Sequence, residues 1–419
     1  MTIKTYNWLI GAAWLAISFA AAPLKAQSLQ SAIESALAND PSLAASGAMV
    51  DMENARLDGA RAASRSSLGL QGSLGASNAD FGGGYKVIYP RALTLAWEKR
   101  LYDGGAALAR IDASEFALAA QNGQHQSAKI NLILATIEAY SNLYVAVQMH
   151  NYADDALKSA QRMARDAGLQ FNVGEVAIGD KALAEASMHR AEAALAKANG
   201  QIRNADANLY RLTNTHFSAL DLAANPPPLP ASEALAKEQA KENHPLIATS
   251  KAQLAAAEAQ IRLANTARQP NVSVSARANT VRDQFLAGYK SDDVGAYLNF
   301  SMPLWDNGRT KSAQGIARAG RDNARANLRA AERMIEMGVT NAFVDYETAK
   351  AEQIAAGAAA EAMQIAFNSA QAQMRVGEKP ISDVLDARTK LTEAQSVLAR
   401  ANAAIVVARY KIALSIGTL

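Results

Sequence analysis

Three charged residues beside one turn of the chain, and a fourth beside an earlier, similar turn, have the types and spacing that could act on a charged solute. Asp383 and Asp386 lie three residues apart at the start of an expected helix, so both carboxylates project from one face. Lys379 lies four residues before Asp383. Asp180 occupies the place of Asp383 in an earlier, similar segment, which also fits a simpler role, stabilisation of a helix start by an acid. That role does not explain Asp386, whose equivalent is Leu183.

The sequence lacks the motifs that would indicate an enzyme or a cofactor site. We find no phosphate-binding loop, no His-Glu-x-x-His, no Gly-x-Ser-x-Gly and no dinucleotide-binding glycine pattern. The five histidines are scattered without metal-ligand spacing, and there is no cysteine to form a disulfide. A net charge of +3 gives no indication of nucleic-acid binding. We therefore expect no catalytic residue, no cofactor and no metal site.

A heptad repeat follows the turn that carries the two aspartates. Large apolar residues recur every seven positions, and alanines fall three residues after each of the first four. The apolar residues are Val384, Leu391, Leu398, Ile405 and Ile412, and the alanines are Ala387, Ala394, Ala401 and Ala408. Alanine at one seam position lets helix backbones approach closely, near the short end of the usual ~8–10 Å. We therefore expect a tightly packed helical hairpin.

The same hairpin is encoded twice, at a constant offset of about 203 residues. The turn Val376-Gly377-Glu378 has its counterpart in Val173-Gly174-Glu175, and glycine at this place is a common helix stop. The alanine seam has its counterpart from Ala184 to Ala205. A helix-compatible run of about 65 residues precedes each turn and can reach roughly 100 Å. The sequence therefore predicts two long antiparallel helix pairs.

Two pairs of alternating segments, one in each half, predict β-hairpins. The first pair comprises residues 68–76 and 89–97, and the second residues 272–278 and 294–302. Each segment is apolar on one face and polar on the other, over about ten residues, which suits a strand that crosses an outer membrane. A strand of a soluble sandwich alternates in the same way, so the periodicity alone does not decide between the two.

A short motif joins each expected hairpin to the long helix after it. It reads Leu101-Tyr102-Asp103-Gly104-Gly105 in the first half and Leu304-Trp305-Asp306-Asn307-Gly308 in the second. Aspartate is a favoured residue at the N-cap of a helix. We therefore expect both aspartates to be N-caps.

The order of these signals divides the chain into four parts. Residues 1–26 are predicted to be a signal peptide, because Lys4 precedes a short apolar stretch; an uncleaved anchor helix is the alternative. Residues 27–213 form a first repeat of helix, hairpin, long helix and helix, and residues 231–419 form the second. Residues 214–230, with the run Pro226-Pro227-Pro228, form a stiff linker. We expect the two repeats to build one structural unit.

Four strands per chain constrain the assembly if they cross a membrane. Lipid-exposed sheet edges are not tolerated there, and closed outer-membrane barrels start at eight strands. Two copies of the chain would give eight strands, whose interior is filled by side chains. Three copies would give twelve strands, which is the smallest cyclic arrangement with room for a lumen. The same three copies would bring their long helix pairs together into a tube.

These features resemble the TolC family of outer-membrane channel proteins, which serve efflux and type I secretion. The resemblance rests on the twin Val-Gly-Glu turns, the segment Asp383-Val384-Leu385-Asp386-Ala387, the twin junction motifs and the duplication, and it covers essentially the whole mature chain. It implies an α+β membrane protein that forms a homotrimer in the outer membrane, in contact with outer-membrane lipid. Its trimeric twelve-stranded β-barrel would be continued by an α-helical barrel as a periplasmic extension. It also implies a periplasmic adaptor and an inner-membrane transporter, either ABC or proton-driven, as partners.

The resemblance also implies a role for the charged turn. In the family, a pair of aspartates at the positions of Asp383 and Asp386 rings the periplasmic entrance. An arginine and a tyrosine hold the family's turn against the other helix pair. Here Lys379 matches the arginine, Asp180 matches an aspartate of that contact, and Met374 stands where tyrosine is expected. Lys379 and Asp180 are therefore expected to hold the gate, in a contact that differs from the family's.

Two rival interpretations of the function remain at this point. The first concerns cargo, because an exit duct for proteins and one for drugs or metals have the same features. The second is a periplasmic adaptor, a membrane-fusion protein with helical hairpins. Adaptors usually have one long hairpin and a compact β-domain, whereas this chain has two hairpins and two strand pairs. The duct is therefore the preferred hypothesis.

Overall fold

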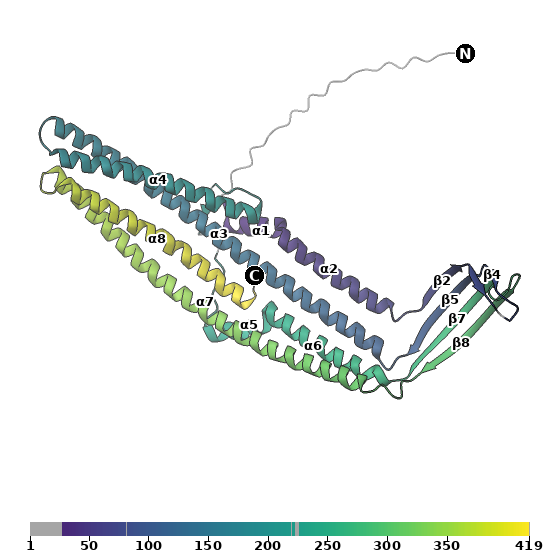
Figure 1. Ribbon diagram of the computed structural model, residues 1–419. Helices are drawn as coiled ribbons and strands as arrows, with labels where there is room; N and C mark the ends of the chain where they lie inside the picture. The colour runs from purple at the N-terminus through teal and green to yellow at the C-terminus, as the bar shows by residue number, and fades with distance from the viewer. Residues whose placement is uncertain (1–26, 81, 219, 223–225, 419) are drawn as a thin grey trace, which may run out of the picture.

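The computed structural model describes residues 27–80, 82–218, 220–222 and 226–418. The expected signal peptide, residues 1–26, lies outside the described residues. The chain forms one elongated body in which long helices run side by side and a β-sheet stands at one end (Figure 1). The tips of two helical hairpins lie at the opposite end.

The elements of the two halves follow the same order. The first half contains β1 (Gln27–Ser28), α1 (Leu29–Asn39), α2 (Pro41–Ala62), β2 (Ser67–Leu74), β3 (Ser77–Ala79), β4 (Lys86–Ile88), β5 (Arg91–Tyr102), α3 (Ala106–Asn172), α4 (Ile178–Thr213) and β6 (Leu220–Asp221). The second half contains α5 (Glu233–Asn243), α6 (Pro245–Asn265), the 3-10 turn η1 (Thr266–Arg268), β7 (Asn271–Arg282), β8 (Lys290–Ser301), α7 (Arg309–Arg375) and α8 (Ile381–Ile416).

The internal duplication is confirmed by the helix lengths. Helices α3 and α7 each have 67 residues, and α4 and α8 each have 36. The first residues of α3 and α7, Ala106 and Arg309, are 203 positions apart, and so are those of α4 and α8, Ile178 and Ile381. Two segments of different sequence therefore adopt the same long hairpin.

Both hairpins turn through the same hydrogen-bonded glycine stop. Gly174 and Gly377 have φ of +81°, a conformation that favours glycine. The amide of Gly377 donates to the carbonyl of Met374 at 3.1 Å, and that of Glu378 donates to Gln373 at 2.9 Å. The turn after α3 has the same two bonds. This is a Schellman motif, which ends the long helix and lets the chain reverse.

The heptad seam is buried, as predicted. The side chains of Val384, Leu391 and Ile412 are fully buried, whereas those of Leu398 and Ile405 are half-buried within the single chain. In α3, Ile137 and Tyr140 also lie in the core and are fully buried. One 18-residue stretch of α3 has the length and composition of a membrane span, but half of it is buried inside the chain, as in a core helix.

The two shorter helix pairs, α1–α2 and α5–α6, each bend at a proline that starts the second helix. Asp40 is the N-cap of α2, and its carboxylate accepts the amides of Ser42 and Leu43 at 2.8 and 3.0 Å. His244 caps α6 in the same way, with its ring accepting the amide of Leu246. Helix α6 packs very closely on α3 at Gly123, where an added Cβ would lie 2.2 Å from Thr249 Oγ1. This close approach helps to place the second repeat beside the first.

The four long strands form one antiparallel sheet in the order β2-β5-β7-β8. Pairing of β5 with β7 joins the two predicted hairpins, and β2 and β8 remain as edges. Two pairs of short strands were not predicted. The pair β3 and β4 extends the first hairpin, and β1 pairs with β6 in parallel beside the helices.

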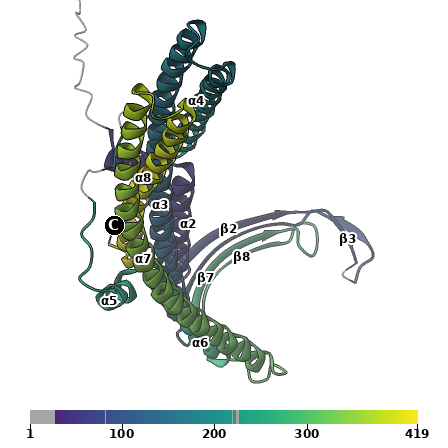
Figure 2. The same ribbon diagram turned by 90° about the vertical axis from the view of Figure 1, so that its left-hand side faces the viewer.

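The register separates the sheet into an apolar and a polar face. One row across the four strands reads Leu70, Leu95, Ala278 and Val294, and the next parallel row on the other face reads Gln71, Thr94, Asn279 and Asp293. The apolar side chains are not covered by any described part of the chain, since Leu70, Val294 and Leu298 are 67%, 86% and 72% exposed. Figure 2 shows the sheet as a bowed layer that extends beyond the helices.

Candidate functional site

The four predicted charged residues lie at the hairpin tips, at the end of the molecule farthest from the sheet (Figure 1). Asp383 is exposed in the first turn of α8, where the positive end of the helix dipole favours an acid. Asp180 is half-buried in the first turn of α4. The fold therefore brings both acids to one end of the molecule, although they come from different repeats.

Asp386 has a partner that the sequence analysis missed. Its carboxylate lies 2.7 Å from Lys390 Nζ, one helical turn further along α8. Both side chains are more than half exposed, so solvent screens the pair and it stabilises the helix only weakly. The four-residue spacing of an acid and a lysine on a helix is the signal that could have identified it. Lys390 therefore partly neutralises the charge of Asp386, the acid that the equivalent turn of the first repeat lacks.

Lys379 and Asp180 do not form an ion pair within the single chain. Lys379 is exposed, and no ion pair joins it to another residue in the part of the chain that the structure describes. Their predicted contact therefore requires a second chain or another arrangement of the two hairpins, and it stays a prediction.

Met374 belongs to an apolar cluster behind the turn. The cluster contains Val384, Leu391 and Phe367, and Met374 packs against it. Arg388 lies over the ring of Phe367, with 5.3 Å between its guanidinium carbon and the ring centroid, and burial lowers the pKa of this guanidinium. The turn is thus held by apolar and cation–π packing within the chain.

The junctions between the strands and the long helices differ from the prediction in one respect. Gly105 and Gly308, with φ of +88° and +86°, are the N-cap residues, and the aspartates lie two positions earlier. Asp306 nevertheless accepts the amide of Thr310 at 2.9 Å, and Asp103 accepts that of Ala107 at 2.8 Å. The predicted N-cap position is wrong, because a left-handed glycine lets the aspartate reach the helix from further back.

The two aspartates do not have equal numbers of partners. Asp306 also contacts the hydroxyl of Thr310 and lies 2.9 Å from Arg268, which follows α6. The pKa of Asp306 is well below its usual value of 3.8, mainly because of Arg268 and then Thr310. Asp103 also accepts backbone amides, but its single side-chain partner among the described residues is Arg100, in a long ion pair at 4.0 Å. The second junction therefore ties the start of α7 to α6.

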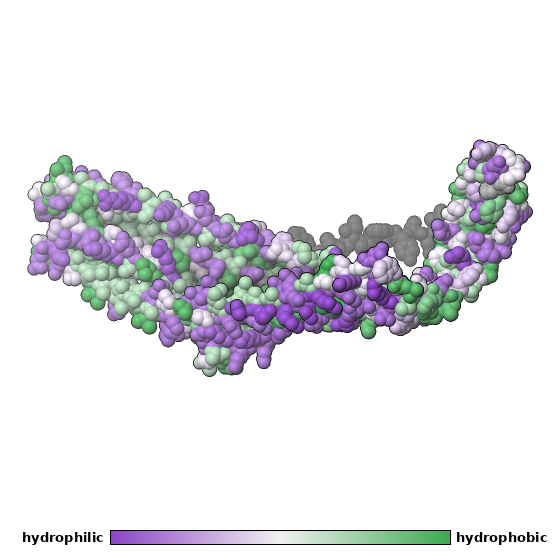
Figure 3. Space-filling view, turned by 60° about the horizontal axis from the view of Figure 1, so that its bottom comes forward, coloured by the Kyte–Doolittle hydropathy of each residue, from purple (hydrophilic) through white to green (hydrophobic). Residues whose placement is uncertain are grey.

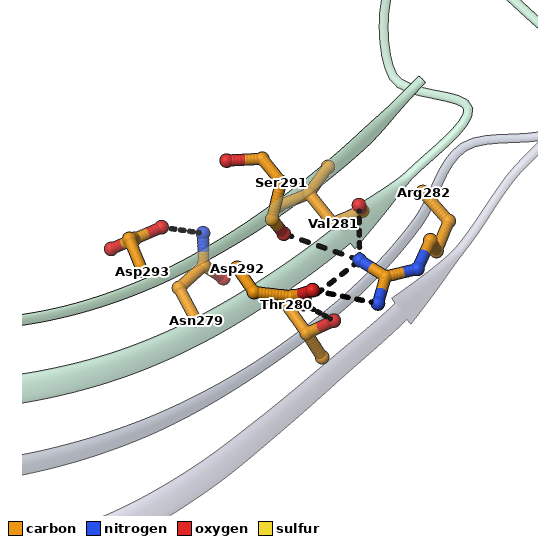
Figure 4. Close-up of polar contacts among 7 residues, drawn as sticks. All are labelled: Asn279, Thr280, Val281, Arg282, Ser291, Asp292 and Asp293. Carbon is orange, nitrogen blue, oxygen red and sulfur yellow. Dashed lines mark hydrogen bonds and ion pairs between the residues drawn. The ribbon is translucent and has the colours of Figure 1, made fainter. Parts of the chain in front are cut away.

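The far end of the sheet, away from the helices, is closed by polar contacts (Figure 4). Arg282 of β7 binds Asp292 of β8 with two nitrogens at 2.9 and 3.0 Å. Thr280 donates to the same carboxylate at 2.6 Å, and Asn279 donates to Asp293 at 3.3 Å on the other face. These bidentate and cross-strand contacts pair β7 with β8 where the apolar face ends.

The sheet and the hairpin tips thus lie at opposite ends of a duplicated helical body. A model of the family "Outer membrane efflux protein" matches residues 32–215 and 236–418, which is most of the chain and both repeats. The chain belongs to the outer membrane efflux protein family. The predicted resemblance to TolC-like channels is confirmed.

Curated relatives carry matching names. The outer membrane efflux protein BepC of Brucella suis is 25% identical over 313 residues, covering 74% of this chain and 68% of BepC. CyaE of Bordetella pertussis is 28% identical over 342 residues, covering 77% of this chain and 70% of CyaE. TolC of Escherichia coli is 28% identical over 330 residues, covering 74% of this chain and 66% of TolC.

Solved structures share the fold. The CmeC outer membrane channel of Campylobacter jejuni has a TM-score of 0.82 at 18% identity, covering 93% of this chain and 85% of CmeC. The open state of the MtrE outer membrane channel of Neisseria gonorrhoeae has a TM-score of 0.74 at 21% identity, covering 93% of this chain and 89% of MtrE. Together with the family match and the curated relatives, this fold makes the protein an outer-membrane channel protein of the efflux family, and the adaptor hypothesis is not supported.

Proposed function

We propose that three copies of this chain close into one duct, with twelve strands in the outer membrane and a helical tube in the periplasm. One observation carries the proposal: the sheet has two free edges, β2 and β8, and an exposed apolar face. Free edges cannot face lipid, and four strands cannot close on themselves. Pairing β8 of one copy with β2 of the next removes every edge and turns the apolar face towards lipid.

The mass of the purified protein in detergent tests this assembly. We expect a particle of three chains that converts to a single chain on heating, extracted from the outer-membrane fraction. A monodisperse single chain recovered from the periplasm without detergent would overturn the proposal.

The charged turn is proposed as the entrance of the duct. If three α7–α8 tips converge, Asp383 and Asp386 contribute six carboxylates to one ring, and Lys390 contributes three ammonium groups. Like charges on low-dielectric walls focus a negative potential, which favours cations. Lys379 and Asp180 are proposed to bias this entrance towards a closed state, because an exposed pair of this kind contributes only about 0–1 kcal/mol and can be released by a partner.

We also propose that a signal peptide is removed from the chain and that its two repeats form one structural unit. Removal of residues 1–26 would leave a chain that starts at Gln27, with repeats 27–213 and 231–419 acting as one unit across the linker 214–230. The mass of the purified chain tests the cleavage site. A chain that retains its first 26 residues would support the anchor-helix alternative instead.

The proposed partners are a periplasmic adaptor and an inner-membrane transporter. The relatives' names include efflux, in BepC, and cobalt-zinc-cadmium resistance, in CzcC of Cupriavidus metallidurans. These names support an exit duct for efflux. Type I secretion is the other proposed use of the same duct, because the transporter selects the cargo. Crosslinking in intact cells, followed by identification of the inner-membrane component, tests this: an ABC exporter or a proton-driven pump is expected.

A further inference from the structure

A row of five arginines follows one face of α7 between the sheet and α5. The row, here called the arginine stripe, consists of Arg318, Arg321, Arg325, Arg329 and Arg333. At 100° per residue, the other residues on this face between the first and last arginine are Asp322 and Glu332. Five cations against two acids leave three more positive than negative charges per chain. Figure 3 shows the corresponding hydrophilic band over α7.

Most of the stripe has no partner within the chain. Arg321 is paired with Asp322 at 2.6 Å. The other four arginines are exposed and form neither an ion pair nor a hydrogen bond with any residue in the described ranges. Arginines spaced four residues apart on a helix repel one another and weaken the helix. The chain therefore maintains a charged face that its own fold does not stabilise.

The sister helix shows that the fold does not need these charges. Because α3 and α7 match at an offset of 203, each arginine of the stripe has an equivalent in α3. The equivalents are Glu115, Leu118, Asn122, Gln126 and Ile130, and none of them is basic. The same 67-residue helix is built without a basic row. The charge of the stripe thus serves something other than helix formation.

The stripe lies on the outer side of the helical layer. Helix α5 packs on the same face of α7, where Lys241 of α5 lies 2.6 Å from Glu336 and Glu233 accepts the hydroxyl of Thr340 at 2.8 Å. Arg318 and Glu336 are 18 residues apart, which is five full turns, so they share a face. Figure 2 shows α5 standing off the long helices as an extra layer. Such a layer inside the tube would fill the duct, so this face points outwards.

The distance from the membrane excludes lipid headgroups as the binding partner. Helix α7 starts at Arg309, four residues after Trp305, which is 81% exposed beside the apolar face of the sheet. With a rise of 1.5 Å per residue, Arg318 lies about 14 Å and Arg333 about 36 Å along α7 from its start. The headgroup layer beside the hydrocarbon core is only about 5–8 Å thick. The stripe therefore stands in the periplasm, beyond the membrane surface.

We propose that the arginine stripe binds the carboxylates of the peptidoglycan layer and fastens the duct to the cell wall. Guanidinium groups pair with carboxylates through two parallel hydrogen bonds, and the peptide stems of peptidoglycan present carboxylates along an extended polymer. The buried core of a protein–protein interface is usually more apolar than its rim, and this face has no apolar side chain between its arginines, which favours an extended anionic polymer over a folded protein. The proposal uses the trimeric duct only to place the stripe on the outside.

Co-sedimentation of the full-length, detergent-purified protein with isolated peptidoglycan sacculi tests the proposal. The stripe variant changes four residues, Arg318→Gln, Arg325→Gln, Arg329→Gln and Arg333→Gln. The matched control removes four exposed cations elsewhere on the helices, Arg165→Gln, Arg190→Gln, Lys197→Gln and Arg203→Gln. Glutamine is a good helix former, so exposed sites in α7 should stay helical. Two controls show that each variant has folded: a trimer band that shifts to a single-chain band on heating, and channel conductance.

We expect the wild type to sediment with sacculi at low salt and less so at high salt, because screening weakens exposed charge pairs. The amount of stripe variant that sediments with sacculi should be lower than that of the wild type by about fivefold or more. The amount of the control should stay within about twofold of wild type. Variants with only two of the four changes should fall between. Amidation of the sacculus carboxylates should abolish the difference between wild type and stripe variant.

Three results would overturn the proposal. The first is undiminished sedimentation of a folded, conducting stripe variant. The second is an equal loss in the control, which would indicate general charge attraction. The third is stripe-dependent binding to phosphatidylglycerol vesicles but not to sacculi, which would assign the stripe to the membrane. None of these results bears on whether the trimer conducts, so failure here leaves the proposed channel function intact.

Discussion

At the scale of single residues, the aspartate pair of the α8 turn carries the proposed selectivity. Replacing Asp383 and Asp386 together by alanine should weaken block by a multivalent cation by about tenfold or more, because all six carboxylates are removed from the ring. Both side chains are exposed, so trimer yield should not change. Current through planar bilayers at increasing cobalt hexammine concentration measures the effect. Equally tight block in the variant would show that the entrance lies elsewhere.

Lys390 gives an opposite prediction at the same turn. Its ammonium lies 2.7 Å from Asp386, so Lys390→Gln removes three positive charges from the neighbourhood of the ring. Block by the same cation should tighten, by up to about fivefold, because fewer positive charges then offset the negative potential of the ring. Lys350→Gln, which is exposed on α7, serves as the control. Weaker block in Lys390→Gln would contradict the assigned position of the lysine.

The aspartates at the two junctions should differ in importance. Asp306→Asn should lower the temperature at which the trimer dissociates more than Asp103→Asn does, because Asp306 alone is held by Arg268 and Thr310. A carboxyl with a lowered pKa contributes stability above its unfolded pKa of about 3.8 and loses it as the pH falls further. The difference between wild type and Asp306→Asn should therefore persist at pH 5 and shrink below about pH 3. Equal effects of the two substitutions would contradict this assignment.

The site was only partly predictable from the sequence. Asp383, Asp386, Lys379 and Asp180 could be placed at hairpin tips, because turn glycines and heptads fix local structure. The role of Met374 could not be predicted, because its contact with the cluster around Phe367 joins residues from different turns of α7 and α8. Whether Lys379 forms an ion pair with Asp180 depends on how the two hairpins pack, and this cannot be predicted from residue spacing within either hairpin.

At the scale of elements, the buried seam of α8 should be the most sensitive feature. Leu391 is fully buried, so Leu391→Asp places a charge without a partner against the apolar cluster and should cost about 3–5 kcal/mol or more. Thr389→Asp, two residues earlier and exposed, should be far milder. The measurement is the amount of trimer, identified by its dissociation on heating, that each variant yields from membranes. Similar yields would show that the seam has been assigned to the wrong face.

The long helices and the strand pairs were predictable because each repeats its pattern over many residues. The 203-residue offset then confirmed each element by a second copy. The short strands β1, β3, β4 and β6 have only two or three residues each, too few to show a period. The order of the sheet also could not be predicted, because the pairing of β5 with β7 joins segments about 180 residues apart. Sequence patterns fixed the strands' faces, and tertiary contacts fixed their neighbours.

At the scale of the whole molecule, a single chain is suited neither to water nor to lipid. Its sheet exposes apolar side chains such as Leu70 and Val294, together with two unpaired edges, so it would neither stay soluble nor insert alone. Its helical layer carries acids at one end and the arginine stripe near the other. The three features lie at different levels along one axis, which fits a duct that crosses the outer membrane and extends into the periplasm.

Single-channel recording of the purified trimer in a planar lipid bilayer tests the central claim most directly. We predict uniform current steps carried mainly by cations, and closure of these steps when a multivalent cation is added on the side of the hairpin tips. The same steps should be absent from preparations dissociated by heating. A folded trimer that inserts into the bilayer and passes no current above the lipid background would contradict the channel function proposed for this architecture.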